Sequence, residues 1–128
     1  MSLLSEIAKV TNELYIGGLI SAKLEKLQKL GISHVINCTI EAKNVDAPGI
    51  QTTRISIDDS PTANLQAEFD NVADLIEDVN KNSGKVLVHC VAGVSRSASL
   101  CIAYLMKYRT LTLLEAHSLL KKARPIIR

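Results

Sequence analysis

Cys90 is followed six positions later by Arg96, and this spacing is the most distinctive chemical feature of the sequence. A cysteine thiolate is a strong nucleophile. An arginine guanidinium can bind two oxygens of one phosphate group, which the single charge of a lysine cannot reproduce. The pair therefore predicts covalent chemistry on a phosphorylated substrate, with Cys90 as the nucleophile and Arg96 as a phosphate-binding residue.

The segment between the two residues lies where a predicted strand leads into a predicted helix. Such a turn points several backbone N–H groups into one concavity, and the helix dipole adds positive potential there. The same field should hold Cys90 as a thiolate, since comparable settings lower a cysteine pKa from about 8.5 to roughly 3.5–7.5. The phosphate-binding residues that we predict between Cys90 and Arg96 are Val91, Ala92, Gly93, Val94 and Ser95.

A phosphate ester also needs an acid to protonate its leaving group. Asp59 is the candidate, in a proline-containing stretch that follows a predicted strand, at the sheet edge where ligands of parallel sheets bind. Asp58 is the alternative, and the spacing of the residues does not separate the two.

The surrounding sequence alternates strand-like and helix-like segments. We predict strands at 14–16, 34–38, 52–57 and 85–88, a loop at 41–49, and helices that start at Ser21, Asn64, Ser97 and Thr112. Gly31, Gly84 and the Arg124-Pro125 pair should end the first, second and fourth helices. This order predicts an α/β fold with a central, mainly parallel sheet of four to five strands and helices on both faces.

Two of the helices carry more specific signals. Residues 97–108 are apolar on most sides, so we expect this helix to be the most buried. Thr112 and Glu115 have the spacing of a capping box at the start of the last helix. The expected core face of that helix is formed by Leu113, Leu114, Leu119 and Leu120.

The composition favours a single soluble domain and excludes several classes of function. The 128 residues carry a formal net charge of +2 and few aromatic side chains, so we expect no nucleic-acid partner. No apolar stretch is long enough to span a bilayer, and the N-terminus has no signal pattern. Three cysteines without a CxxC pair indicate a reducing compartment and no zinc site, so we expect a location in the cytoplasm, with the nucleus also open.

The stretch from His89 to Ser97 matches the signature H-C-x-x-G-x-x-R-S and resembles the small atypical dual-specificity phosphatases of the cysteine-based protein tyrosine phosphatase superfamily. Further similarity lies in 14–17, 35–37, 98–99 and 102–106. The resemblance implies a phosphocysteine intermediate and no metal or cofactor. It also places the general acid on Asp59, gives Ser97 a hydrogen bond to the Cys90 sulfur, and makes His89 a support for the loop.

The resemblance further implies a phosphoprotein substrate and a shallow site that accepts both phosphotyrosine and phosphoserine/threonine. The variable loop positions Val91, Ala92 and Val94 lack the lysines that a phosphoinositide-directed loop would carry. One alternative is a catalytically idle module that binds phosphorylated partners, and another is a phosphatase of a non-protein substrate. Intact Cys90 and Arg96 favour the enzyme.

The C-terminus departs from the family pattern. Relatives continue after Arg124-Pro125 with a further helix, whereas this chain stops at Arg128. We therefore expect residues 1–128 to form one catalytic domain without that helix, which leaves the covering of Ile126 and Ile127 as an open point.

The two remaining cysteines have different expected roles. Cys38 ends a strand that could neighbour the loop, and we hypothesise a protective disulfide with Cys90 under oxidation. Cys101 lies in the most apolar helix and is predicted to belong to the core.

Overall fold

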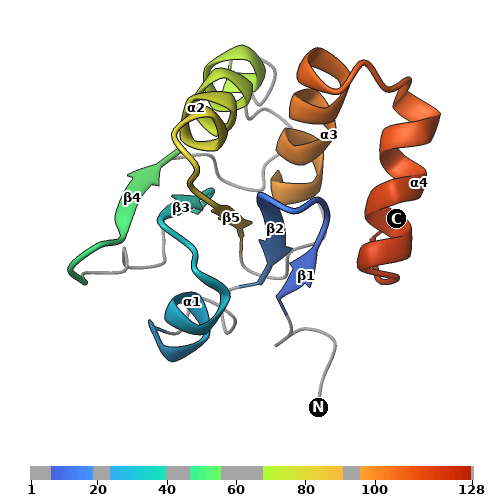
Figure 1. The fold of residues 1–128 in the computed structure, drawn as a ribbon. Helices are drawn as coiled ribbons and strands as arrows, with labels where there is room; N and C mark the ends of the chain where they lie inside the picture. Colours follow the sequence, from blue (N-terminus) through green and yellow to red (C-terminus); the bar gives the residue numbers. More distant parts are fainter. Residues whose placement is uncertain (1–6, 19–23, 40–46, 56–67, 91–95, 128) are drawn as a thin grey trace.

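The computed structural model describes residues 7–18, 24–39, 47–55, 68–90 and 96–127, which form a five-stranded sheet and four helices (Figure 1). The strands are β1 (Ala8–Lys9), β2 (Leu14–Gly17), β3 (His34–Asn37), β4 (Gln51–Arg54) and β5 (Val86–His89). The helices are α1 (Leu24–Leu30), α2 (Phe69–Lys81), α3 (Arg96–Tyr108) and α4 (Leu113–Ala123). The sheet order is β1-β2-β5-β3-β4, with β1 antiparallel to β2 and all other neighbours parallel. The predicted fold class is confirmed.

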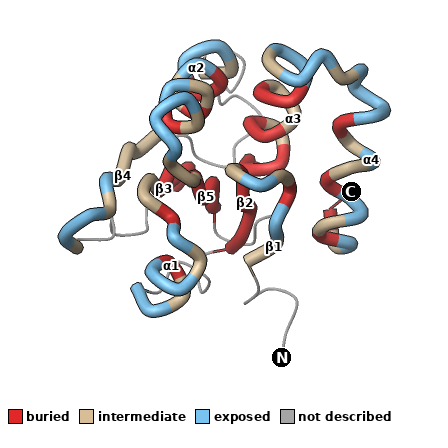
Figure 2. The backbone as a smooth tube through the Cα atoms, in the orientation of Figure 1, coloured by how far each residue is buried: buried red, intermediate tan, exposed pale blue. Residues whose placement is uncertain are grey.

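The central strands are buried on both faces, and alternate residues belong to two separate cores (Figure 2). In β5, Val86 and Val88 face the larger core with α2, α3 and α4, whereas Leu87 faces the smaller core with α1. This alternation follows from the period of two along a strand. The prediction of helices on both faces is therefore confirmed, since of the described helices α1 covers one face and α2, α3 and α4 lie on the other (Figure 1). No helix in these described ranges is long and apolar enough to cross a membrane.

Helix α3 is the most buried helix, as predicted. It contacts α2, α4, β2 and β5. Its buried residues run from its first residue to its tenth, and they are Arg96, Ser97, Ala98, Leu100, Cys101, Tyr104 and Leu105. Because α3 contacts both the sheet and its helical neighbours, its first turn is held firmly against the end of β5.

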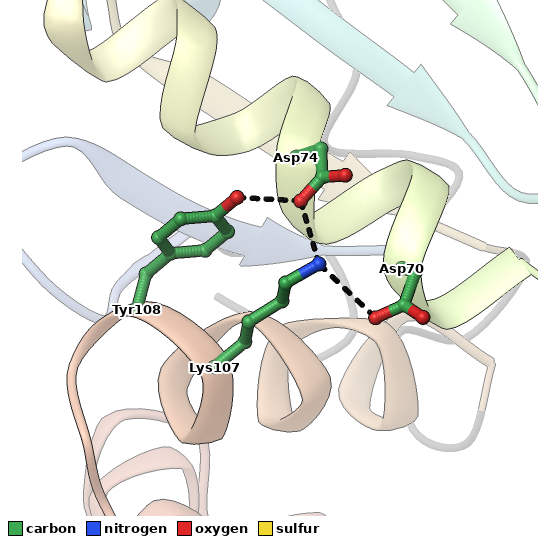
Figure 3. Close-up of polar contacts among 4 residues, drawn as sticks. All are labelled: Asp70, Asp74, Lys107 and Tyr108. Carbon is green, nitrogen blue, oxygen red and sulfur yellow. Dashed lines mark hydrogen bonds and ion pairs between the residues drawn. The ribbon is translucent and has the colours of Figure 1, made fainter.

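A polar network on the surface joins α3 to α2 (Figure 3). The Lys107 Nζ atom lies 3.2 Å from an Asp70 oxygen and 2.9 Å from an Asp74 oxygen. The Tyr108 hydroxyl donates a hydrogen bond of 2.5 Å to Asp74. Each of these exposed interactions contributes little on its own, roughly 0–1 kcal/mol. Together they link the exposed sides of α2 and α3.

The ends of the predicted elements agree with the structure to within a few residues. Gly31 follows α1 with a φ of 74°, as a C-terminal glycine does. After α2, however, Ser83 and not Gly84 takes the left-handed conformation, with a φ of 63°. Gly84 is required for close packing instead, since a Cβ there would lie 2.6 Å from both Ser33 Oγ and Val79 Cγ1. The predicted caps Ser21 and Asn64 lie outside the described residues.

Helix α4 confirms the predicted capping box but corrects the predicted core face. Thr112 Oγ1 accepts from the Glu115 N–H at 3.1 Å, and Glu115 accepts from the Thr112 N–H at 2.9 Å. Leu113 and Leu114 are 60% and 75% exposed, whereas Leu120 is fully buried. Leu114 is about 200° from the buried Ala116 around the helix axis, and Leu113 lies in the first turn, before the buried stripe begins. The adjacent Leu113 and Leu114 are therefore not part of the core.

The residues after α4 return to the core. Arg124 ends the helix in an extended conformation, as expected for a residue that precedes a proline. Ile127 is 1% exposed, and its carbonyl accepts a hydrogen bond from Lys121. Ile126 is half-buried. The sequence left the covering of these two residues open, and the structure shows that Ile127 is covered by the core.

We predict that Leu120→Ala lowers the free energy of unfolding by about 2–5 kcal/mol, because it leaves a cavity in the larger core. The matched variant Leu114→Ala should change stability by less than about 0.5 kcal/mol, since that side chain is mostly in solvent. Urea unfolding followed by circular dichroism measures both values. Equal losses in the two variants would contradict the burial pattern of α4.

Candidate active site

The candidate site lies where β5 ends and α3 begins. Cys90 directly follows β5, and Arg96 is the first residue of α3. Because β2, β3 and β5 are parallel, their carboxyl ends meet at this edge of the sheet. The predicted phosphate-binding residues between Cys90 and Arg96, from Val91 to Ser95, lie outside the described residues, as do both acid candidates, Asp58 and Asp59.

The Cys90 side chain is buried and contacts the first turn of α3. Its Sγ atom lies 3.3 Å from Ser97 Oγ, and either atom can be the donor in this contact. Both residues are at most 2% exposed. A hydroxyl at this distance can donate a hydrogen bond to a sulfur anion, which a buried anion requires. The structure therefore brings together the predicted nucleophile and the predicted Ser97.

Arg96 places a cationic side chain in the same region. It is 7% exposed, an unusual degree of burial for an arginine, and it occupies the N-terminal end of the α3 dipole. Burial is the main cause that raises the pKa of the Cys38 thiol, and the charge of Arg96 acts in the opposite direction. As the first residue of α3, Arg96 precedes the serine whose hydroxyl contacts the Cys90 sulfur.

His89 is the last residue of β5 and directly precedes Cys90. Its imidazole is 1% exposed, and burial is the main cause that lowers its pKa from the ordinary value of 6.5. A hydrogen bond with the Cys90 backbone acts in the opposite direction, and the charge of Arg54 lowers the pKa further. His89 is therefore neutral at physiological pH and acts as a structural neighbour of Cys90.

A polar frame at the same edge was not anticipated from the sequence. Arg54, the last residue of β4, donates a 2.7 Å hydrogen bond to the Thr39 carbonyl. The Thr39 N–H and hydroxyl both donate to Asn37 Oδ1, at 3.0 and 2.8 Å. Asn37 and Thr39 are fully buried, so this network ties the ends of β3 and β4 together beside His89. The sequence signal that could have predicted this network is the presence of polar residues at the ends of the strands.

Cys38 lies beside Cys90 at the end of the neighbouring strand. The pairing of Asn37 with His89 continues one residue further, where the Cys38 N–H donates to the His89 carbonyl at 2.8 Å. Burial, followed by the charge of Cys90, raises the pKa of the Cys38 thiol to about 12. Burial also raises the pKa of Cys101, which is fully buried in α3 as predicted. Both thiols therefore stay protonated at neutral pH.

The described part of the chain contains no candidate metal site. No three histidine, cysteine, aspartate or glutamate side chains gather there in a way that could hold an ion.

Comparisons with known proteins agree on one family. The family model described as the catalytic domain of dual specificity phosphatases matches residues 14–128. Dual specificity protein phosphatase 14 of Mus musculus is 47% identical over 123 residues, which cover 95% of this chain and 62% of that protein. Dual specificity protein phosphatase 18 of Bos taurus is 43% identical over 125 residues, which cover 97% of this chain and 66% of that protein. The chain thus spans less than two thirds of the length of these curated relatives.

Solved structures give the same result. The crystal structure of human DUSP28 aligns with a TM-score of 0.90 and 31% identity, over 95% of this chain and 83% of that one. The human tyrosine phosphatase-like serine/threonine/tyrosine-interacting protein aligns with a TM-score of 0.88 and 31% identity, over 97% of this chain and 87% of that one.

The lowered pKa of His89 predicts a loss of stability on acidification. Between its lowered folded pKa and its ordinary value of 6.5, the unfolded chain binds more protons than the folded protein. The free energy of unfolding should therefore fall as the pH drops below 6.5, with a slope of up to about 1.4 kcal/mol per pH unit. Asp74 and Glu115, with ordinary values of 3.8 and 4.5, lose their contributions only at lower pH.

Urea unfolding at pH values from 7.5 to 5.5 tests this prediction. His89→Gln should remove most of the slope, because glutamine does not titrate. An identical slope in both proteins, or stability that increases on acidification, would contradict the assignment.

The position of Cys38 predicts a disulfide with Cys90 under mild peroxide. Neighbouring strands lie about 4.8 Å apart, within the Cα separation of about 4.4–6.8 Å that disulfides need. Two thiols and one hydrogen peroxide would give one disulfide and two waters. After denaturation and thiol titration, wild type should lose two of its three thiols together, and a reductant should restore both.

The control for this experiment is Cys38→Ser, in which Cys90 oxidises alone and passes to forms that a reductant does not recover. If peptide mapping of the oxidised wild type finds no link between positions 38 and 90, the pairing is wrong.

Proposed function

The chain belongs to the dual-specificity phosphatase family, and we propose that it is a protein phosphatase that hydrolyses phosphotyrosine and phosphoserine/threonine through a phosphocysteine intermediate. The observation that supports this proposal most directly is the 3.3 Å contact between Cys90 Sγ and Ser97 Oγ next to the buried Arg96. A sulfur, a hydroxyl and a guanidinium are the groups that such chemistry requires.

In the first proposed step, the Cys90 thiolate attacks the phosphorus atom of the substrate. A sulfur–phosphorus bond forms as the ester oxygen–phosphorus bond breaks. The backbone amides of 91–95 and the Arg96 guanidinium hold the phosphate oxygens, where negative charge must be stabilised. Asp59 gives its proton to the departing oxygen, because an unprotonated alkoxide leaves poorly.

In the second proposed step, water hydrolyses the phosphocysteine. The Asp59 carboxylate accepts a proton from the attacking water, and the sulfur–phosphorus bond breaks to release inorganic phosphate. Ser97 donates a hydrogen bond to the sulfur as it regains its negative charge, which makes the thiolate a better leaving group. No metal or cofactor takes part in this scheme, and His89 supports the loop without contacting the substrate.

A phosphoprotein is the proposed substrate, because the curated relatives are named protein phosphatases and the variable loop positions carry no lysine. The human protein named above as phosphatase-like and interacting has the same fold, so the fold alone does not separate an enzyme from a binding protein. The presence of Cys90, Arg96 and Ser97 in this chain favours catalysis over a binding module. Three free thiols fit a reducing compartment, and we propose the cytoplasm, with the nucleus also open.

We predict that p-nitrophenyl phosphate is hydrolysed in the presence of EDTA and that vanadate inhibits the reaction. Cys90→Ser should lower kcat by about 10³-fold or more, since it removes the nucleophile. The matched control is Cys101→Ala, which removes a different buried thiol and should keep most of the activity. Equal rates in wild type and Cys90→Ser would disprove the role of Cys90, and loss of activity in EDTA would disprove the metal-free scheme.

The same assay with a phosphotyrosine peptide separates the two acid candidates, because its leaving group depends more on protonation. Asp59→Ala should lower kcat by about 10²-fold and remove the loss of activity at high pH. Asp58→Ala should stay close to wild type. The reverse result would move the acid role to Asp58.

A further inference from the structure

The last residues of three parallel strands form one row at the end of the sheet that precedes Cys90. His89 of β5 is paired with Asn37 of β3, and Asn37 is paired with Arg54 of β4. Residues paired in this way project from the same face of a sheet. Leu87, two residues before His89, faces the smaller core, whereas Cys90 belongs to the larger core. Arg54 therefore projects from the face opposite to Cys90, and it can influence Cys90 through the backbone and through its charge.

Arg54 holds the end of β3 in position. Its Nη1 atom donates to the Thr39 carbonyl at 2.7 Å. Thr39 in turn donates from its N–H and its hydroxyl to Asn37 Oδ1, at 3.0 and 2.8 Å. Asn37 and Thr39 are fully buried, so the loss of one of these bonds leaves a buried polar atom that water does not reach. The three hydrogen bonds therefore restrain the segment 37–39 in addition to the strand pairing.

The restrained segment holds the peptide unit from which the nucleophile starts. Cys38, its middle residue, donates its N–H to the His89 carbonyl at 2.8 Å. That carbonyl lies in the planar peptide unit that also contains the Cys90 nitrogen, so the two move together. The Cys90 Sγ atom lies 3.3 Å from Ser97 Oγ, and a rotation of this peptide unit changes that distance. Hydrogen bonds and one peptide unit thus connect Arg54 to the position of the sulfur.

The charge of Arg54 reaches the same end of β5. Burial is the main cause that lowers the pKa of His89, and the charge of Arg54 lowers it further. Two strand spacings of about 4.8 Å place the backbones of these two residues about 10 Å apart. At that range a positive charge lowers the midpoint of thiol ionisation by roughly 0.3–1 pH unit, for a dielectric between those of a protein surface and water.

The other titratable groups around Cys90 in the described ranges add one further cation. His89 is neutral at physiological pH, and the other two cysteines are buried and stay protonated. Arg96, the first residue of α3, is the cation. Of the described groups around Cys90, the positive charges are therefore those of Arg96 and Arg54.

We propose that Arg54 is a positioning residue for the phosphatase reaction: through Thr39 and Cys38 it fixes the peptide unit that begins Cys90, and its charge favours the thiolate form of that residue. This role rests on the proposed function, and it adds a residue outside the signature at 89–97 that acts through its neighbours. A guanidinium suits both tasks, because it is always charged and donates its hydrogen bonds in a fixed plane.

The test compares Arg54→Gln with Arg54→Lys. Glutamine removes the charge and is too short to keep the bond to the Thr39 carbonyl, whereas lysine keeps the charge and a donor. Alkylation of Cys90 by iodoacetamide from pH 4 to 8, followed by mass spectrometry, gives the midpoint of thiol ionisation. This reagent is neutral, so its approach does not depend on the charge at position 54. Arg54→Gln should raise the midpoint by about 0.3–1 pH unit, and Arg54→Lys should stay within about 0.2 pH unit of wild type.

Kinetics with p-nitrophenyl phosphate at pH 7 give the second readout. Misplacement of the nucleophile should lower the kcat of Arg54→Gln about ten-fold, with KM changed less than about two-fold, because the phosphate-binding residues remain. Thr39→Val keeps every charge and the shape of the side chain but removes one hydrogen bond to Asn37. It should lower kcat about three-fold, and it tests the backbone connection independently of how stable Arg54→Gln is.

The matched control is Arg109→Gln. Arg109 forms an ion pair with Glu13, which precedes β2 and therefore lies at the opposite end of the sheet from Cys90. This variant loses the same charge and a contact that supports folding, and it should keep the midpoint and the kcat of wild type. Urea unfolding confirms that each variant is folded under the assay conditions.

The proposal is overturned if Arg54→Gln keeps the wild-type midpoint, if Arg54→Lys shifts it as far as Arg54→Gln does, if Thr39→Val leaves kcat unchanged, or if Arg109→Gln gives the same changes. A wild-type protein that hydrolyses no phosphate ester would contradict the proposed function instead, and the alkylation midpoints would still show whether Arg54 acts on Cys90.

Discussion

The proposed chemistry depends on one contact, between a sulfur atom at the end of a buried strand and a hydroxyl at the start of the most buried helix. Cys90 and Ser97 are held 3.3 Å apart because β5 is covered on both faces and α3 is packed against four other elements. A buried thiolate is tolerated only where hydrogen bonds and positive charge replace water. The α3 N-terminus, Arg96 and Ser97 supply these at one point, so the fold determines the chemical state that we propose for the nucleophile.

The three cysteines show how position determines reactivity within one small core. Cys38 and Cys101 are buried, and burial raises the pKa of both thiols, so neither is a nucleophile at neutral pH. Cys90 differs in its contact with Ser97, which lies in the first turn of α3 directly after Arg96. The same residue type thus serves as packing material in two positions and as the proposed reactive group in the third. If Cys38 and Cys90 form the predicted disulfide, oxidation of Cys90 stops at a product that a reductant can reverse.

Much of this arrangement could be predicted from local sequence, and the exceptions have physical causes. The strand at 86–89, the helix that follows it and the capping box at Thr112 all depend on short-range patterns, and the structure contains them. The predicted core face of α4 was correct for Leu119 and Leu120 but wrong for Leu113 and Leu114, because the exposure of these two side chains depends on where the neighbouring helix lies. The network of Arg54, Thr39 and Asn37 joins the ends of two separate strands, and no short-range sequence pattern predicts these hydrogen bonds.

The central claim, that Cys90 is held as a reactive anion, is tested most directly by alkylation with iodoacetate at pH 6. Mass spectrometry of the digested protein identifies which of the three thiols has reacted. The account predicts rapid labelling of Cys90 alone, prevented by vanadate and slowed in Ser97→Ala. Labelling of Cys90 that is no faster than that of Cys38 or Cys101, or that vanadate does not affect, would contradict it.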